Sequence, residues 1–596
     1  MKSAQEFMHW FEVGAGSRWI RVAAILAGTL VLSLLVAWKQ FHGPVSEITL
    51  QQADVARQLA NGAGFTTLVN YPQTVAFLRA RGIPFDPARP NPELHQAPLY
   101  SILIAGALRL LPDEKRAALF AKAPTPPDGF AADYFLLGLN LILLWLATWL
   151  TYDLGRRLFE ARVGLLAAFG LLLSVSIWQE TVAVNGTPLV MVLILLAFQT
   201  WHRIESLAAS VAEGRAPVGW LALLGGLCAG LFLVEYSIGA LVFVALVYAA
   251  LRFRGRTGLL ASASIALGFV VVSGPWVARN VAVAGHPVAL AAQSLALKAG
   301  DPTAEPARVI ATLSAATPRL DLRKLANKTL TSLQENLETR VWSGGAMWFT
   351  AFFVAGWLYA FKAPGTNRLR WVATAAFGVL LVAQAALGSG DTERHVAVWF
   401  APLLMIFGAG FFFVLLGSNA VLSAWPRTVA AVLVLLQALP LLHDALEPRR
   451  LHFNYPPYFP GLFQGMRHEL ERRGAVGTFG IMADVPAGVA WYAQTRAWLQ
   501  PPTLRDFHAI TLEQSIGELL LTPRTLDRPF FSELSARPAL PGTFGILPHR
   551  FGEWGEVYAG LLTGAMPAEF PLGSPQKLAE NLFVLLNPAL PASRGK

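Results

Sequence analysis

Residues Tyr134–Tyr152 read YFLLGLNLILLWLATWLTY, nineteen residues without one charged side chain. A helix needs about 20 such residues to cross the roughly 30 Å hydrocarbon core of a bilayer. Because only a closed helix hides its backbone polar groups in hydrocarbon, this run predicts a transmembrane helix. Ten further runs of this kind lie along the chain: Val22–Trp38, Val163–Gln179, Thr181–Trp201, Ala216–Val234, Tyr236–Leu251, Thr257–Ala278, Val341–Phe361, Trp371–Gly390, Val396–Pro426 and Thr428–Leu442. The sequence therefore predicts an all-α polytopic membrane protein.

The composition excludes other classes. The 596 residues are 54% hydrophobic and only 14% charged, which excludes a soluble globular protein and a disordered one. The net charge is +10, but the basic residues lie mostly in short loops, where they indicate orientation and contact with anionic lipid rather than nucleic-acid binding. The single cysteine, Cys228, excludes an intramolecular disulfide and a metal site built on cysteine.

Loop charges predict the topology. One set of short loops is rich in arginine and the other carries mostly acids, which places the N-terminus in the cytoplasm. The first apolar run follows Arg18 and Arg21 without a convincing cleavage site, so we expect a retained anchor rather than a signal peptide. The short segment Pro98–Leu111 is either a tilted span or a helix dipping into the outer leaflet. We expect 11–13 transmembrane helices, an odd number, with the C-terminus outside.

Four regions follow from this topology. Residues 1–38 are the cytoplasmic N-terminus and first span, and residues 39–97 are a first outer loop. Residues 98–442 are the multi-span domain with a second outer loop at 279–340. Residues 443–596 are a small extracytoplasmic α/β domain, with a strand expected at Thr478–Ala483, a helix at Val485–Gln494 and a helix-to-strand stretch at Ile516–Thr522. We expect the three outer pieces to converge over one cavity.

The first outer loop carries an amphipathic helix at Glu47–Ala60. Its apolar face has Ile48, Val55 and Leu59 at helical spacing, and Asn61-Gly62 is a C-terminal stop signal. The opposite face carries Glu47, Gln51, Asp54 and Gln58. Such a helix either lies on the membrane with its polar side in water or presents carboxylates to a site at the boundary.

Three motifs follow one another along the chain. The first outer loop has Asp54, Ala56-Arg57, Leu59, Gly62-Ala63-Gly64-Phe65 and Pro98-Leu99-Tyr100. The second is the stretch Gly274-Pro275-Trp276-Val277-Ala278-Arg279-Asn280, and the third is Glu393-Arg394-His395 leading into Pro402. In this order the motifs resemble those of the C-type glycosyltransferase superfamily, in particular its bacterial members that use polyprenyl-phosphate sugars, such as the mannosyltransferase-like ones.

The resemblance implies transfer of a sugar from a polyprenyl-phosphate donor to an acceptor lipid, glycan or protein outside the membrane. A carboxylate would act as general base, with Asp54 the first choice and Glu47 the second. Arg279, Arg394 and His395 are candidates for binding the donor phosphate, and His95 and Tyr100 for the substrate loop. The family's usual acidic position holds Gln51 here, which leaves a non-catalytic scaffold as an alternative.

Each candidate also has a structural alternative. Arg279 can snorkel at the end of its span, Arg394 can pair with neighbouring acids, and His95 can pack the loop. No cofactor is implied with certainty, since a divalent metal at Asp54, His95 or His395 has no ligand spacing behind it. A transporter or flippase is a further alternative, although no internal repeat supports it. The expected location is the inner membrane of a bacterium, among membrane lipids and with no nucleic-acid partner.

Overall fold

The structure is a computed structural model of the chain. It describes residues 15–44, 46–87, 89–121, 129–210, 216–301, 303–388, 396–418, 420, 422–447, 460–522, 557, 570–573, 575–579 and 582–591. The predicted phosphate-binding residues Arg394 and His395 lie outside these described residues.

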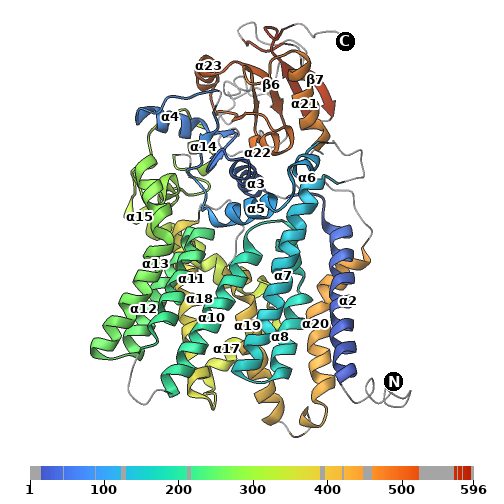
Figure 1. Cartoon of the computed structure of the whole chain (residues 1–596), viewed down its shortest axis with the longest axis vertical. Coiled ribbons are helices and arrows are strands. Elements are labelled where there is room, and N and C mark those ends of the chain that lie inside the picture. The colour runs from blue at the N-terminus through green and yellow to red at the C-terminus, as the bar shows by residue number, and fades with distance from the viewer. Residues whose placement is uncertain are drawn as a thin grey trace, which may run out of the picture.

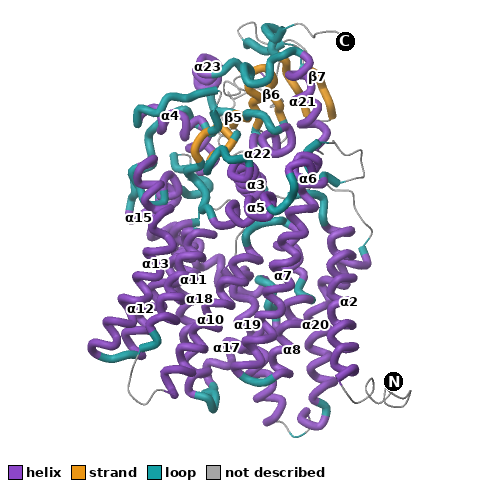
Figure 2. Tube along the Cα trace, viewed as in Figure 1, coloured by secondary structure: helices purple, strands orange, loops and turns teal. Residues whose placement is uncertain are grey.

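A bundle of long apolar helices makes up the lower part of the molecule (Figures 1 and 2). Among the described residues, seven helices are long and apolar enough to cross a membrane: α2 (Ala15–Gln40), α7 (Ala131–Leu158), α10 (Thr187–Ser210), α13 (Gly255–Ala284), α18 (Pro364–Leu387), α19 (Val396–Ser418) and α20 (Pro426–Leu446). The fold is therefore a polytopic helical membrane protein, as the apolar runs predict.

Shorter and bent helices complete the bundle. Helices α8 (Ala161–Leu172) and α9 (Val175–Val182) form one pair bent by 55°, and Leu322–Ser343 with Trp348–Leu358 forms another bent by 115°. Two shorter apolar helices, α11 (Val218–Val234) and α12 (Leu241–Arg252), stand beside α10 and α13 in Figure 1. By length and composition, the described part of the chain thus has seven candidate spans, or up to nine if each bent pair is one span.

Helices α11 and α13 touch through their backbones. A Cβ added at Gly225 would lie 2.0 Å from the carbonyl oxygen of Ile265, and one at Gly268 would lie 2.0 Å from that of Ala222. Close approach of this kind needs small residues, and it is a common way for helices to associate in a bilayer. The glycines therefore set the spacing of this helix pair.

The ambiguous segment Pro98–Leu111 forms α5 (Leu99–Arg109). Eleven residues of helix measure about 16 Å, too short to cross a bilayer. Helix α5 instead lies beside α3 (Glu47–Ala60) where the bundle meets the upper part of the molecule (Figure 1). Tyr100 fixes it there, because its buried hydroxyl lies 2.9 Å from both Asn140 Oδ1 and the carbonyl oxygen of Val184.

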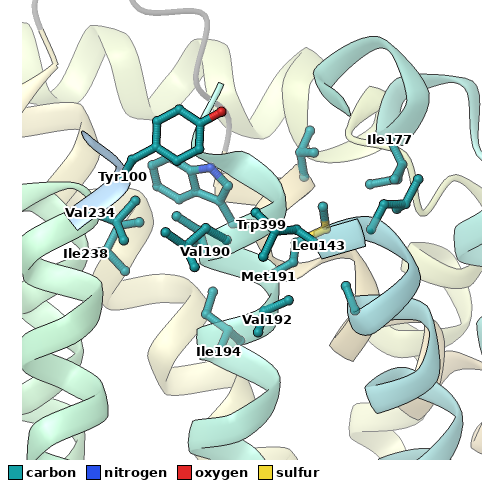
Figure 3. Packing of buried hydrophobic residues seen from close by; sticks show 14 of the residues in the cluster. Tyr100, Leu143, Ile177, Val190, Met191, Val192, Ile194, Val234, Ile238 and Trp399 are labelled. Carbon is teal, nitrogen blue, oxygen red and sulfur yellow. The ribbon is translucent and has the colours of Figure 1, made fainter. Parts of the chain in front are cut away.

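Figure 3 shows the packing below this anchor. Tyr100, Trp399, Val190, Met191 and Leu143 all belong to the same buried apolar cluster, with Tyr100 at the top of this view. All five side chains are buried. The substrate-loop candidate Tyr100 is thus part of the bundle core.

The upper region in Figure 1, called the head below, contains a mixed sheet whose described strands run in the order β2-β5-β4-β6-β8-β7. The strands are β2 (Val69–Asn70), β4 (Gly480–Ala483), β5 (Ala497–Leu499), β6 (Ile516–Leu521), β7 (Gln576–Ala579) and β8 (Leu582–Leu586). Strands β2, β5, β4 and β6 are parallel, while β8 is antiparallel to its two neighbours. The strand expected at Thr478–Ala483 is confirmed as β4, and the stretch expected to pass from helix to strand at Ile516–Thr522 forms the strand β6.

The first outer loop is part of this sheet. Strand β2 pairs in parallel with β5, with Val69 opposite Ala497. A second, two-stranded sheet joins β1 (Thr66–Thr67) to β3 (Asn91–Pro92) within the loop. The helix expected over Val485–Gln494 is α22 (Pro486–Gly488) followed by the π-helical turn η6 (Val489–Ala493).

The second outer loop joins the other two pieces. Gln73 and Gln293 exchange side-chain hydrogen bonds of 2.8 and 3.0 Å, and the backbone amide of Leu290 donates to the carbonyl of Leu94. The amide of Leu313 donates to Asp506 Oδ2 in the tail helix α23 (Leu504–Glu513). These hydrogen bonds show that the three outer pieces lie together.

The remaining head helices are α4 (Pro72–Ala80), α6 (Asp113–Ala118), α14 (Pro306–Ala311), α15 (Leu322–Glu335) and α21 (Pro460–Arg472).

Cysteine labelling tests the orientation. The single native cysteine is buried, so cysteines introduced at the exposed Leu512 in α23 and at the exposed Arg254 before α13 can be labelled separately. We predict that Leu512→Cys reacts with an impermeant maleimide in intact spheroplasts, whereas Arg254→Cys reacts only after permeabilisation. The opposite pattern would invert the predicted topology.

A buried carboxylate in the head makes its stability depend on pH. Glu518 in β6 is 1% exposed, and neither oxygen has a hydrogen-bond partner among the described residues. Burial raises the pKa of Glu518 to about 8, against the opposing charge of Arg473. Between its ordinary pKa near 4.5 and this value, the folded state holds a proton that the unfolded state has released.

The free energy of unfolding of the head is therefore expected to fall as pH rises through about 8. Thermal unfolding should show a lower midpoint at about pH 9 than at about pH 6. Glu518→Gln removes the titrating group, so its midpoint should change less over the same range. An identical pH dependence in both proteins would show that Glu518 does not titrate in this window.

Candidate functional site

Helix α3 forms with the bounds that the sequence predicts, but it does not lie in water. The hydroxyl of Ser46 accepts a hydrogen bond from the Thr49 amide at its start, and Gly62 follows its end at a φ of +85°. Eleven of its fourteen residues are buried, and Glu47, Ile48 and Leu59 are only half-exposed. A membrane-surface helix with a wet polar face is thus not what the chain forms.

Asp54, the first-choice base, is completely buried in α3. Its Oδ1 lies 2.5 Å from Nη2 of Arg57, one turn further along the helix. Its Oδ2 accepts hydrogen bonds from Thr67 Oγ1 at 2.9 Å and from the backbone amide of Leu68 at 2.8 Å. Both oxygens of this carboxylate are therefore engaged within the protein.

Arg57 connects α3 to the tail. Its guanidinium donates to the carbonyl oxygens of Ala490 at 2.7 Å and Trp491 at 2.9 Å, both in η6. It also lies 5.4 Å from the ring centre of Phe120 and 5.5 Å from that of Trp491. Burial lowers the pKa of Arg57, and the charge of Asp54 opposes this effect. The pair Asp54–Arg57 thus joins the first outer loop to the tail.

A second polar link joins the same turn to the bundle. Trp491 Nε1 donates to Asp133 Oδ1 at 2.9 Å, and the hydroxyl of Tyr492 donates to Asp133 Oδ2 at 2.8 Å. Asp133 lies in the first turn of α7 and is buried. The residues predicted from the sequence do not include it, although an acid directly before an apolar run is a signal of a functional or structural role.

Gln51 occupies the position where the resemblance expects an acid, and it contacts one. Its amide nitrogen donates to Glu93 Oε2 at 2.5 Å, and its amide oxygen accepts from the hydroxyl of Tyr71 at 2.9 Å. Glu93 Oε1 accepts from the backbone amides of His95 at 2.6 Å and Gln96 at 3.0 Å. Burial raises the pKa of Glu93, while these hydrogen bonds and the charge of Arg279 oppose the rise.

Glu93 is 1% exposed and is absent from the residues that the sequence predicts. The available signal was its place two residues before His95, within the loop that carries the motif.

Arg279 brings two predicted motifs together. Its guanidinium donates to the carbonyl oxygen of Glu93 at 2.7 Å, and more weakly to that of Phe65 at 3.3 Å. It lies 4.8 Å above the ring of Trp276, and the same ring meets Phe65 edge to face at 4.7 Å between centres. The glycine-x-glycine-aromatic and proline-tryptophan elements are therefore in contact, and Arg279 braces them.

His95 packs within the same loop. Its Nε2 lies 2.8 Å from Thr74 Oγ1, and its ring meets Tyr71 edge to face. Burial lowers the pKa of His95 to about 4, so the imidazole is neutral at physiological pH.

Glu47 differs from the other acid of α3 because it is half-exposed. It begins the helix seven residues after the end of α2, the first span. Phe41, between the two helices, packs on Tyr134 near the start of α7, with ring centres 5.2 Å apart. Glu47 therefore lies shortly after the end of α2, where the chain also contacts the start of α7.

Two pockets stand out in the described part of the chain. One of about 860 Å³ lies between the end of α3, helices α6 and α21, and turn η6, with Arg57, Asn61, Arg116, Gln464 and Arg467 among its lining residues. One of about 330 Å³ lies in the second outer loop. The larger pocket is lined by residues of the first outer loop and the tail, among others, and by none of the second outer loop.

No group of three or more histidine, cysteine, aspartate or glutamate side chains in the described ranges is arranged to hold a metal ion.

Comparison with protein-family models finds no match, and comparison with curated protein sequences finds none either. Among solved structures, the chain is similar to the oligosaccharyltransferase of Archaeoglobus fulgidus in complex with zinc and sulfate, at a TM-score of 0.46 and 11% identity over 83% of this chain and 67% of that one. It is also similar to ArnT from Cupriavidus metallidurans bound to undecaprenyl phosphate, at a TM-score of 0.39 and 12% identity over 97% of this chain and 100% of that one.

Replacing Asp54 tests its position in the head. Asp54→Asn leaves the buried Arg57 guanidinium without its counter-charge, which typically costs about 3–5 kcal/mol. We predict a large drop in the thermal unfolding midpoint of the purified protein. Asp113→Asn is the matched control, because it removes an exposed partner of Arg116 and should change the midpoint little. Equal unfolding midpoints for the wild type and Asp54→Asn would show that the Asp54–Arg57 pair does not stabilise the folded head.

Proposed function

We propose that this chain is a membrane glycosyltransferase that moves a sugar from a polyprenyl-phosphate carrier to an acceptor on the outer face of the membrane. The observation that carries the proposal is the placement of α3. This helix carries the first motif, is held between bundle and head, and has one half-exposed carboxylate, Glu47, at its membrane-proximal start. Its partner motifs meet it through Glu93 and Arg279.

The proposed reaction needs a base at this boundary. The acceptor hydroxyl attacks the anomeric carbon of the sugar, the bond from that carbon to the phosphate oxygen breaks, and the lipid phosphate leaves with the electron pair. Glu47 takes the hydroxyl proton during the attack. A carboxylate in the first turn of a helix also interacts favourably with the positive end of the helix dipole.

The other two acids suit a positioning role better. Both oxygens of Asp54 are engaged by Arg57 and the loop backbone. Both oxygens of Glu93 accept hydrogen bonds, and only 1% of the residue is exposed. A base must reach the proton that it removes, so the proposal reverses the order expected from the sequence and puts Glu47 ahead of Asp54.

The donor phosphate needs cations. Arg279 is half-buried, and its guanidinium donates to Glu93, Asn280 and Phe65, so its fork is largely occupied. We therefore propose that Arg394 and His395 stabilise the negative charge that develops on the leaving phosphate. These two residues precede α19 in the sequence and lie outside the described residues.

A scaffold without catalysis is the second candidate function. It is favoured by Gln51, which stands at the usual acidic position and hydrogen-bonds Glu93 rather than facing an open site. Transport or flipping of an envelope glycan precursor would likewise leave Glu47 without a role in chemistry.

A transfer assay separates these functions. We predict that Glu47→Gln lowers the rate of sugar transfer from a polyprenyl-phosphate donor by about 10²–10⁴-fold, with an unchanged unfolding midpoint, because it removes the base but keeps the size of the side chain. Glu338→Gln, at an exposed carboxylate of the second outer loop, is the control and should transfer normally. Full activity of Glu47→Gln with loss of activity in a folded Glu93→Gln variant would move the base to Glu93. Normal envelope glycans in cells that lack the protein would favour the scaffold.

A further inference from the structure

The smaller pocket lies at the outer edge of the membrane region. It is formed by the stretch that follows the turn η2 (Ala289–Leu295) and by the first half of α15. Turn η2 begins five residues after the end of the spanning helix α13, and α15 packs against the spanning helix α18. In Figure 1, α15 stands at the level where the bundle meets the head.

The pocket carries more positive than negative charge. We call it the lysine pocket; its charged lining residues are Lys298, Arg319, Lys324, Lys328, Asp301 and Asp321. Asp321 Oδ1 accepts from the backbone amides of Arg323 and Lys324 at the start of α15. Asp301 pairs with Lys324 at 3.2 Å and also accepts from Thr303. The two acids are therefore engaged with their neighbours, and the other three basic side chains have no acid partner among the described residues.

The environment of Lys328 gives the strongest indication that the pocket binds an anion. Its residue is only 5% exposed, and its ammonium donates one hydrogen bond, of 2.6 Å, to the carbonyl oxygen of Ser294. No carboxylate in the described ranges forms an ion pair with it. An ammonium group has three donors, and burying its charge without a counter-charge is costly. An anion in the pocket would supply that counter-charge.

The helix beside the pocket has an apolar face that no described part of the chain covers. Leu322 and Leu330 in α15 are 74% and 64% exposed, and Leu337 in the following turn is 51% exposed. Their spacing of eight and seven residues puts them on one side of the helix. An amphipathic helix with such a stripe next to basic residues binds where lipid headgroups meet acyl chains.

We propose that the lysine pocket binds the phosphate of an anionic membrane lipid, with the leucines of α15 on the acyl chains of the same leaflet. The net positive charge of the pocket favours a lipid headgroup that carries a net negative charge. A phosphatidylglycerol headgroup offers one uncompensated negative charge, whereas phosphatidylcholine carries its own cation beside the phosphate. This site is separate from Glu47 and does not depend on the proposed transfer reaction.

Native mass spectrometry of the full chain tests the site. The detergent-purified protein is mixed with equal amounts of phosphatidylglycerol and phosphatidylcholine, and the retained lipids are counted. We expect the wild type to retain phosphatidylglycerol preferentially. Lys328→Met and the double change Lys298→Gln with Lys324→Gln should each weaken this retention, by about five-fold for every lysine removed. Arg323→Gln, which removes an exposed charge of α15 outside the pocket lining, should retain the lipid as the wild type does.

Three results would overturn the proposal. One is wild-type retention of phosphatidylglycerol by the folded double variant, which alters only exposed lysines and so separates lipid binding from folding. Another is an equal loss in Arg323→Gln, which would show attraction to general surface charge. The last comes from inorganic phosphate, used as a separate probe in a thermal-shift assay. If inorganic phosphate stabilises the wild type and phosphatidylglycerol does not, the pocket holds a free anion rather than a lipid.

Discussion

The buried ion pair between Asp54 and Arg57 is the constraint on which the outer half of the molecule depends. Two opposite charges stay out of water only if each is fully satisfied by partners, and here those partners come from separate parts of the chain. Asp54 binds the backbone and hydroxyl of the β1 region, and Arg57 binds the carbonyl groups of η6 more than 430 residues later. Because η6 also donates to Asp133 at the top of α7, one polar network fixes α3 to the bundle below and the head above.

The acidic residues near the junction of bundle and head differ in how far they are buried. Asp54, Glu93 and Asp133 are buried and hydrogen-bonded, which suits them to hold backbone segments in place. Glu47 shares a helix with Asp54 but is half-exposed. A helix held at its centre positions its first turn with little freedom, and such rigidity is what an acid–base group needs for a fixed distance to its substrate. The proposed catalytic role of Glu47 thus follows from the structural role of Asp54.

Much of the fold could be predicted from local patterns. The long apolar runs predicted the bundle, helical spacing predicted α3 with its correct bounds, and strand β4 lies within the expected strand Thr478–Ala483. The stretch at Ile516–Thr522 was expected to pass from helix to strand, and it forms the strand β6. Pairing between strands that are far apart in the sequence could not be predicted, because no residue near Val69 indicates that it lies opposite Ala497. Burial of α3 was missed for the same reason, since its polar face is covered by the distant tail. The motifs contain Phe65, Trp276 and Arg279, but their order along the chain does not show that these side chains meet, nor that Arg279 donates to backbone carbonyls. The sequence analysis did not predict a role for Glu93, because a loop residue does not belong to any helical or strand periodicity.

The most direct test of the account is an experimental structure with a polyprenyl-phosphate sugar analogue bound. The account predicts that the anomeric carbon lies closer to the carboxylate of Glu47 than to any other acid, and that Asp54 still pairs with Arg57 as it does without ligand. A sugar in contact with Asp54, with the Asp54–Arg57 pair opened to receive it, would contradict the account.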